Sequence, residues 1–417
     1  MPVTTSIQPA LPAHAASEHH FSYLPDMQQL VLQGLFAWFG MLMGSWASRI
    51  PALTQHLHMS HTQLSLVLLC AGLGAVLSIM LSGYWLSRFS STGILRTGSA
   101  ALLSSLMAIG AMPTVPWLML AVFMLGIAAS LLDVALNTVA TQEEHSKGLP
   151  ILSRLHACAC AGGLAGITLG SLMAWMDISP LLHFSLIALP MLYLLPAWIR
   201  KLKQVRQVSR PKTSSRLGQG SLSWLGALGF MGAIAEGSIA GWSGIFMKEQ
   251  YGTGEGFAPM ALLVFSVMML LARLQGDQLK NIYGAQKLVC CGGLMASAGM
   301  FVASFAANQY LALAGFALTG LGLALLCPFI FSAAGNQGTA ALSSLAIMSY
   351  GGGLMGPPLL GTIAQTLGLQ AVMVLTGTLM LGIALASLHT RWNLGLNAIA
   401  ATDERMFLKS NECFQSA

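Results

Sequence analysis

The sequence is dominated by long apolar stretches that are separated by short segments containing Gly, Pro and Ser. A helix needs about 20 mostly apolar residues to cross the hydrocarbon core of a bilayer. Twelve stretches of this kind are present. They lie at about 29–50, 64–87, 93–112, 116–141, 155–176, 181–199, 221–247, 257–275, 286–306, 309–333, 339–365 and 370–390. The pattern predicts an all-α membrane protein with twelve transmembrane helices.

The composition excludes the common soluble alternatives. Of the 417 residues, 55% are hydrophobic and only 8% are charged, against roughly 25% charged residues in a soluble domain. A soluble chain of this size could not cover so much apolar surface with polar residues. A cytosolic enzyme, a secreted domain and a disordered protein are therefore excluded, and a lipid bilayer is the expected surroundings.

The basic residues predict the topology. The segment 200–216 carries seven Lys and Arg residues and no acid, so the positive-inside rule places it in the cytoplasm. Threading outward then places every other basic residue except Arg49 and Lys248 on the cytoplasmic side. We expect both termini in the cytoplasm and a multi-pass protein of the bacterial inner membrane. The basic segment is a solvated linker, or alternatively a site for anionic lipid; no nucleic-acid motif accompanies it.

The two halves of the chain resemble each other in near-constant register. The repeated features are Gly162 to Gly166 with Gly352 to Gly356, Gly126 and Asp133 with Gly320 and Cys327, and Trp46 with Trp242. Two parallel six-helix bundles with a cavity between them near the bilayer midplane are typical of such repeats. We expect a disordered cytoplasmic tail at 1–28, bundles at 29–199 and 221–390, a basic linker at 200–220 and a cytoplasmic tail at 391–417.

Two acids fall inside the predicted spans, where a charge is costly and usually functional. Asp133 has Asn137 four residues on, on the same helical face. Because low dielectric favours the protonated carboxyl, such an acid can exchange protons. Alternatively, Asp133 pairs with His156 and fixes packing. Glu236, near the middle of the seventh span, is the second proton-coupling candidate, or alternatively a protonated acid bound to another helix.

Several further residues are candidates for substrate binding. Trp46 and Trp242 occupy equivalent places in the first span of each half, and aromatic faces suit sugars and cations; alternatively, both belong to an interfacial aromatic belt. Asn137, His156 and Tyr350 offer hydrogen bonds. We interpret Arg49 as an anchor and His183 as interfacial. The other candidate, a metal site at His56, His58 and His61, is less favoured than three solvated loop histidines, and we expect no metal.

Several motifs resemble those of the major facilitator superfamily over about residues 29–390. They are Asp133-Val-Ala-Leu-Asn137, Pro328-Phe-Ile-Phe-Ser332, Gly351-Gly352-Gly353 and Gly356-Pro357-Pro358. The chain looks most similar to the branch that contains the fucose:proton symporter. In that symporter an acid at the place of Asp133 couples proton and sugar, which implies the same role here.

The superfamily's loop pattern G-x-x-x-D-[RK]-x-G-x-[RK] is only partly present after the second span. Gly83 and Arg88 match, whereas Ser87, Ser90 and Thr92 replace the acid, the second glycine and the last basic residue. The equivalent loop of the second half keeps Gly276, Asp277 and Gly284. The resemblance implies gating roles for Gly83, Arg88, Gly276 and Asp277.

These observations favour a secondary transporter without cofactor. No phosphate-binding G-x-x-x-x-G-K-[ST] loop is present, so an ion gradient must drive transport, and the two acids favour protons. We expect a monomer that moves a small polar solute, a sugar among the candidates. Efflux of small or amphipathic compounds is the alternative, although the fifth span lacks the Gly-Pro element of drug antiporters. A nutrient sensor is a further alternative; the singly placed acids argue against an enzyme.

Overall fold

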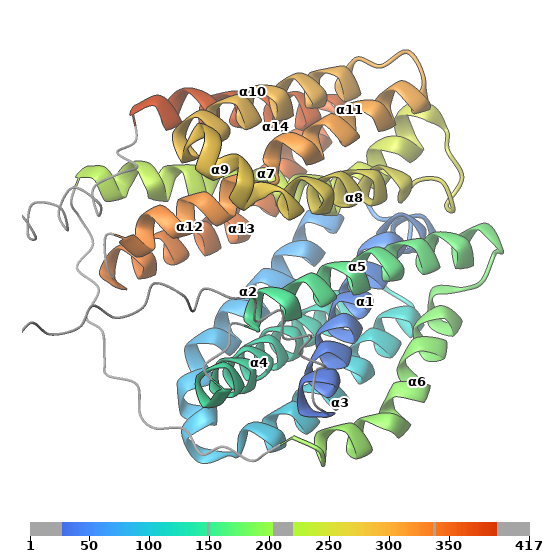
Figure 1. Ribbon diagram of the computed structural model, residues 1–417. Coiled ribbons are helices and arrows are strands. Elements are labelled where there is room, and N and C mark those ends of the chain that lie inside the picture. The colour runs from blue at the N-terminus through green and yellow to red at the C-terminus, as the bar shows by residue number, and fades with distance from the viewer. Residues whose placement is uncertain (1–26, 148–150, 203–219, 337–338, 390–417) are drawn as a thin grey trace, which may run out of the picture.

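The computed structural model describes residues 27–147, 151–202, 220–336 and 339–389. Within these ranges the chain is built from helices and turns, with no strand (Figure 1). The fourteen helices are α1 Met27–His56, α2 His61–Arg88, α3 Ser91–Ala111, α4 Val115–Lys147, α5 Leu152–Trp175, α6 Pro180–Ile199, α7 Gly220–Tyr251, α8 Met260–Leu274, α9 Gly276–Tyr283, α10 Ala285–Ser304, α11 Gln309–Leu323, α12 Leu326–Asn336, α13 Thr339–Leu367 and α14 Leu369–His389. The predicted tails and most of the predicted linker lie outside the described residues.

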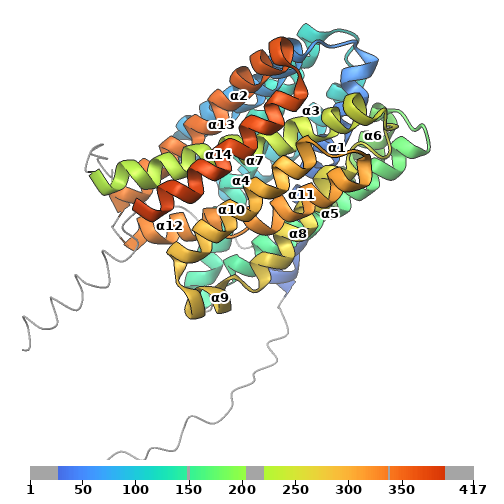
Figure 2. The ribbon, with the colours of Figure 1, turned by 90° about the horizontal axis from the view of Figure 1, so that it is seen from above.

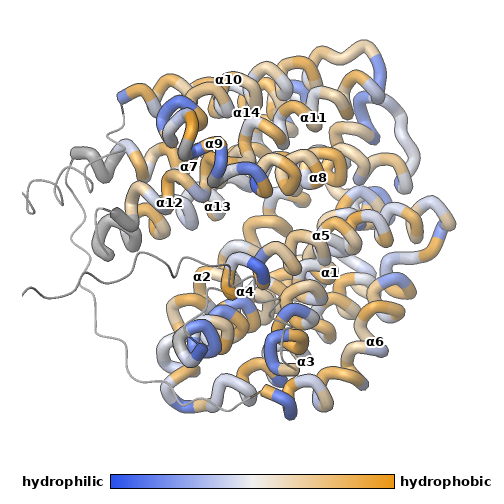
Figure 3. The backbone as a smooth tube through the Cα atoms, in the orientation of Figure 1, coloured by the Kyte–Doolittle hydropathy of each residue, from blue (hydrophilic) through white to orange (hydrophobic). Residues whose placement is uncertain are grey.

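The helices have the length and composition of membrane spans. In the described ranges, nine helical segments are long and apolar enough to cross a bilayer, α11 and α12 together counting as one. The predicted spans at 221–247, 257–275 and 339–365 fall on α7, α8 and α13, and their crossing stays a prediction. Apolar residues dominate along the helices, and hydrophilic residues gather near the turns (Figure 3).

The predicted tenth span is interrupted, because α11 ends at Leu323 and α12 begins at Leu326. Pro328 explains the break, since it has no N–H to donate to the carbonyl of Ala324 four residues earlier. Arg273 of α8 satisfies that carbonyl instead, with Nε 3.1 Å from the oxygen of Ala324. The proline therefore bends the span and creates an attachment point for α8.

Close helix packing in both bundles depends on equivalent glycines. A Cβ atom added at Gly162 of α5 would collide with the backbone carbonyl of Ala37 in α1, whereas the nearest atom to one added at Gly163 lies 3.7 Å away. In α13, a Cβ atom at Gly352 would collide with the backbone of Phe230, and one at Gly353 would meet nothing within 4 Å. The first glycine of each repeated pair thus lets two backbones touch.

The two halves repeat one packing scheme. In the first half α1 packs on α5, α2 on α4, and α3 on α4 and α6; in the second half α7 packs on α13, α8 on α11, and α10 on α11 and α14. The chain is therefore an all-α membrane protein of two helical bundles, α1–α6 and α7–α14 (Figures 1 and 2). The bundles meet through α2 against α13, α5 against α8 and α1 against α7.

The ends of the bundle are named here by their turns. The outer end holds the turns at 57–60, 176–179 and 252–259, and the inner end holds the opposite helix termini. These names follow the positive-inside prediction. At the inner end α4 runs to Lys147, beyond the predicted limit of the span, because Glu143 is held there by two partners. Its carboxylate lies 2.6 Å from Gln28 Nε2 of α1 and 2.6 Å from Lys147 Nζ.

Candidate transport site

A cavity of about 510 Å³ lies between the bundles. The first bundle supplies most of its wall from α1, α2 and α4, and the second bundle supplies Tyr350 of α13. Phe39, Met43 and Trp46 of α1 present apolar and aromatic surface to the cavity, and Asp133 of α4 supplies a carboxylate. This volume lies within the range of small-molecule sites, about 300–1,000 Å³.

A chain of hydrogen bonds leads from the cavity to the inner end. Asn137 lies one helical turn after Asp133, so the two side chains share a face of α4. Asn137 Nδ2 donates to Asp133 Oδ1 over 3.0 Å and to the Asp133 carbonyl over 2.9 Å. His156 Nε2 of α5 lies 3.1 Å from Asn137 Oδ1, and His156 is exposed. The three residues thus connect a cavity carboxylate to an exposed imidazole.

The acid of the second bundle has different surroundings. Glu236 of α7 is partly buried, and Cys327 of α12 lies with Sγ 4.0 Å from Glu236 Oε2. Cys327 occupies the place in the second half that Asp133 occupies in the first. Glu236 is not among the residues that line the 510 Å³ cavity. The two predicted proton-coupling acids therefore lie on different bundles, and only Asp133 faces this cavity.

The two equivalent tryptophans also differ in their surroundings. Trp46 lines the cavity and is partly buried. Trp242 is fully buried and packs edge-on against His61, with ring centroids 6.1 Å apart. Nε1 of Trp242 has no hydrogen-bond partner in the described part of the chain. The structure thus brings Trp46, Asp133 and Tyr350 together around one cavity and places Trp242 near the outer end.

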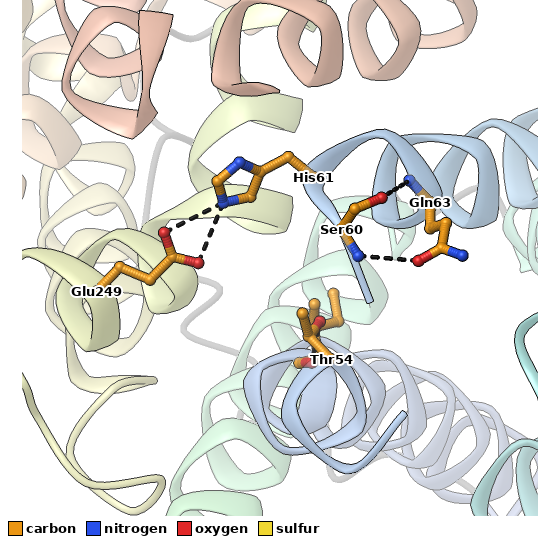
Figure 4. Close-up of polar contacts among 6 residues, drawn as sticks. Thr54, Ser60, His61, Gln63 and Glu249 are labelled. Atoms are coloured by element: carbon orange, nitrogen blue, oxygen red, sulfur yellow. Dashed lines mark hydrogen bonds and ion pairs between the residues drawn. The ribbon is translucent and has the colours of Figure 1, made fainter. Parts of the chain in front are cut away.

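Polar contacts join the two bundles at the outer end. His61 begins α2 and points toward Glu249 of α7, with Nε2 3.1 Å from both carboxylate oxygens (Figure 4). Ser60 caps α2 by accepting from the backbone N–H of Gln63, whose side chain accepts from the N–H of Ser60 (Figure 4). This reciprocal cap fixes the start of α2 and with it the position of His61. The interpretation of His61 as a solvated loop residue is therefore wrong.

Two further contacts join the bundles at the same end. Lys248 of α7 donates to the Gln55 side chain of α1 and also lies 3.5 Å from Glu255 of its own bundle. Ser171 of α5 donates to the carbonyl of Gly256. We name His61, Glu249, Lys248 and Gln55 the outer gate. One sign of this gate was visible in the sequence, the placement of Lys248 on the outer side, but its partners were not.

Near the outer gate, Arg49 is fully buried inside the first bundle, where it holds α1 to α5 and to the turn between α5 and α6. Its guanidinium donates to the carbonyls of Gly170, over 3.4 Å, and Ile178. His183 of α6 is also fully buried, and neither ring nitrogen has a partner among the described residues. His183 is thus enclosed within the first bundle, and its interfacial depth stays a prediction; Arg49 lies where an anchoring role would place it.

The predicted gating loops lie at the inner end. The guanidinium of Arg88, the last residue of α2, lies 5.6 Å from the ring centroid of Tyr84. Ser90 replaces the second glycine of the loop pattern and caps α3, accepting from the N–H of Gly93 over 3.1 Å. Gly83 has open space where a side chain would stand. Gly276 begins α9; the backbone of Asp277 follows it, but its side chain lies outside the described part of the structure.

Known proteins with related sequences and folds place this arrangement in a family. The sequence model of the Major Facilitator Superfamily matches residues 3–337. An uncharacterized MFS-type transporter of Yersinia pestis is 29% identical over 371 residues, covering 88% of this chain and 97% of that protein. The nucleoside transporter NupG has a similar fold, with a TM-score of 0.73 at 13% identity over 87% of this chain and 99% of NupG. The E. coli fucose:proton symporter FucP superposes with a TM-score of 0.59 at 16% identity, and the match covers 88% of this chain and 99% of FucP.

The chain is a multi-pass membrane transporter protein rather than an enzyme, and it belongs to the Major Facilitator Superfamily. The resemblance predicted from its motifs is confirmed, both by the family match and by the fold shared with the fucose:proton symporter. At such low identity the solved structures show the fold alone, so substrate and coupling must be argued from the residues of this chain.

Proposed function

We propose that the protein is a proton-coupled secondary transporter that moves a small polar solute by alternating access. The observation that carries the proposal is the location of Asp133 in the cavity, connected through Asn137 to the exposed His156. A carboxylate in such a site can be protonated from one side and can contact solute from the other. Proton and solute would then bias one conformational equilibrium through their differential affinities for its two states.

The contacts between the bundles support alternating access. The first bundle forms most of the cavity wall and Tyr350 of α13 adds to it, so a solute that lies between Asp133 and Tyr350 would contact both bundles. The outer gate joins the same two bundles through exposed polar contacts, which can open at low cost. The close backbone contacts at Gly162 and Gly352 instead hold helices together within each bundle. Each bundle is thus suited to move as a unit while the outer gate opens and closes.

Efflux of small or amphipathic compounds is the second candidate function. The apolar and aromatic side chains that form most of the cavity wall, among them Phe39, Met43 and Trp46, favour it. Uptake and efflux use the same conformational cycle and differ in the direction of the coupled gradients. The direction of solute-dependent proton movement distinguishes them.

The test is solute-dependent proton flux in proteoliposomes loaded with a pH-sensitive dye. A panel of monosaccharides, nucleosides, organic amines and organic acids is applied to the native protein. We expect at least one solute to move protons, and we expect Asp133→Asn to abolish that flux because the variant side chain carries no exchangeable acidic proton. Uptake coupled to proton entry supports symport, and proton movement against the solute supports efflux.

The control is Asp177→Asn, the same chemical change in an exposed outer turn. Asp177 has a positive φ of 56°, a conformation that Asn tolerates, so this variant is expected to fold and to transport normally. Full proton-coupled transport by Asp133→Asn would refute the assignment of Asp133.

A further inference from the structure

The cavity contains one charged group. Among its described lining residues, Asp133 is the only acid, and there is no Lys, Arg or His. Two basic groups of the second bundle, Arg273 and Lys280, have partners outside the cavity. Arg273 donates to the carbonyl of Ala324, and Lys280 lies 3.1 Å from Ser332 Oγ. The charge of the cavity wall is therefore negative when Asp133 is ionised.

The carboxylate has one oxygen free for a ligand. Asn137 donates to Oδ1 over 3.0 Å, and in the described part of the chain no side chain donates to Oδ2. The titratable groups that face Asp133 are His156, through Asn137, and Tyr350 across the cavity. Neither carries a permanent positive charge that would neutralise the carboxylate. A bound solute, or the proton that the proposed cycle delivers to Asp133, would supply the missing positive charge or hydrogen-bond donor.

The other cavity residues narrow the choice of ligand. Beyond Asp133, the polar groups on the wall are those of Ser130, Trp46 and Tyr350. A solute with many hydroxyl groups would leave most of them without partners against an apolar wall, which is costly. An anion would face the carboxylate directly. A cation would instead be attracted by the carboxylate and by the faces of the aromatic rings.

We propose that the cavity selects solutes that carry a single positive charge, as an organic ammonium ion does, and binds them between Asp133 and the rings of Trp46 and Tyr350. This inference rests on the proposed function, because it assumes that the cavity is the solute site. Trp46 belongs to the first bundle and Tyr350 to the second, so the same cation would contact both bundles and respond to their relative movement.

The test measures the charge preference of the cavity without a known substrate. Ser130 lines the cavity one helical turn before Asp133, so Ser130→Cys places a thiol beside the carboxylate. The thiol is reacted with three methanethiosulfonates of similar size: the cationic trimethylammonium-ethyl, the neutral hydroxyethyl and the anionic sulfonatoethyl reagents. The rate of modification is measured by mass spectrometry on the peptide that contains residue 130. It is divided by the rate at which the same reagent reacts with 2-mercaptoethanol in solution, which corrects for differences in the intrinsic reactivity of the reagents.

We expect the normalised rate of the cationic reagent to exceed that of the anionic reagent by about tenfold. This is the ratio expected when the Asp133 carboxylate, roughly 6 Å away through water, attracts the cation and repels the anion. Adding Asp133→Asn should remove the preference, and adding Asp133→Glu should retain it. An anionic reagent that reacts as fast as the cationic one would overturn the proposal, as would a preference that survives Asp133→Asn. Because no transport is measured, a cation preference without any solute-dependent proton flux would refute the proposed function alone.

Discussion

The outer gate yields a prediction whose size follows from its exposure. The His61 and Glu249 side chains retain 21% and 49% of their accessible surface, so their contact, which is an ion pair when His61 is protonated, is screened and is worth about 0.2–1 kcal/mol. Glu249→Gln removes the charge and keeps a side chain of the same size. If the gate stabilises the state closed at the outer end, this change raises the population of the opened state by about 1.4- to 5-fold.

The assay is the rate at which a membrane-impermeant maleimide reacts at position 65. Ser65 of α2 is only 3% exposed and lies against Gly361 of α13, so a cysteine placed there by Ser65→Cys can react only when the bundles separate. The reporter chain also carries Cys70→Ala, which removes the native thiol on the same helix. When opening is rare, the reaction rate is proportional to the open population, and Glu249→Gln should raise it by the factor above.

Glu255→Gln is the matched control. Glu255 pairs with Lys248 over 3.5 Å with similar exposure, 35% and 22%, but both residues belong to the second bundle. The same charge is removed from the same end of the molecule while the contact between His61 and Glu249 is kept; because Glu255 also attracts Arg49 of the first bundle, any rise should be smaller than with Glu249→Gln. A rise with Glu255→Gln equal to that with Glu249→Gln, or no rise with either, would refute the gate. High salt should reduce the Glu249→Gln effect, since it screens exposed charges.

Two predictions concern stability and are measured by thermal unfolding of the detergent-solubilised protein. Gly162→Ala should lower the free energy of unfolding by about 1–3 kcal/mol, because its methyl group would push α5 away from α1. Its neighbour Gly163→Ala should be neutral or stabilising by up to about 1 kcal/mol, because the site has room and Ala favours helix; equal losses would contradict the packing argument. Arg49→Lys should also destabilise, by about 1–3 kcal/mol, because one ammonium group cannot serve two separated carbonyls as the guanidinium fork does; an unchanged melting temperature would show that the carbonyls find other partners.

Part of the candidate site could be predicted from the sequence because it is local. Asp133 and Asn137 are one turn apart on a helix, so their contact follows from helical geometry, and the structure has it at 3.0 Å. The contact of His156 with Asn137 could not be predicted in this way, because it depends on the packing of α5 beside α4. The cavity could not be predicted either, because Tyr350 of α13 reaches it from the other bundle.

Other residues could not be assigned because their partners are distant in the sequence. His61 and Glu249 are 188 residues apart, and nothing in the local pattern of either indicates the other. Trp46 and Trp242 are equivalent in the repeat, yet one lines a cavity and the other is fully buried. A repeat predicts equivalent places in two bundles, but not which side chains the other bundle covers.

The class of fold follows from the amino-acid sequence alone. Lipid cannot satisfy backbone hydrogen bonds, so long apolar stretches must become helices, and the basic segments and the glycine repeat indicate the order and pairing of those helices. Which polar groups meet, by contrast, depends on the packing of the helices in three dimensions. Asp133 faces a cavity, Glu236 lies by Cys327, and His61 reaches Glu249. Those outcomes depend on how two bundles dock, and docking is set by side-chain contacts between segments that the sequence holds far apart.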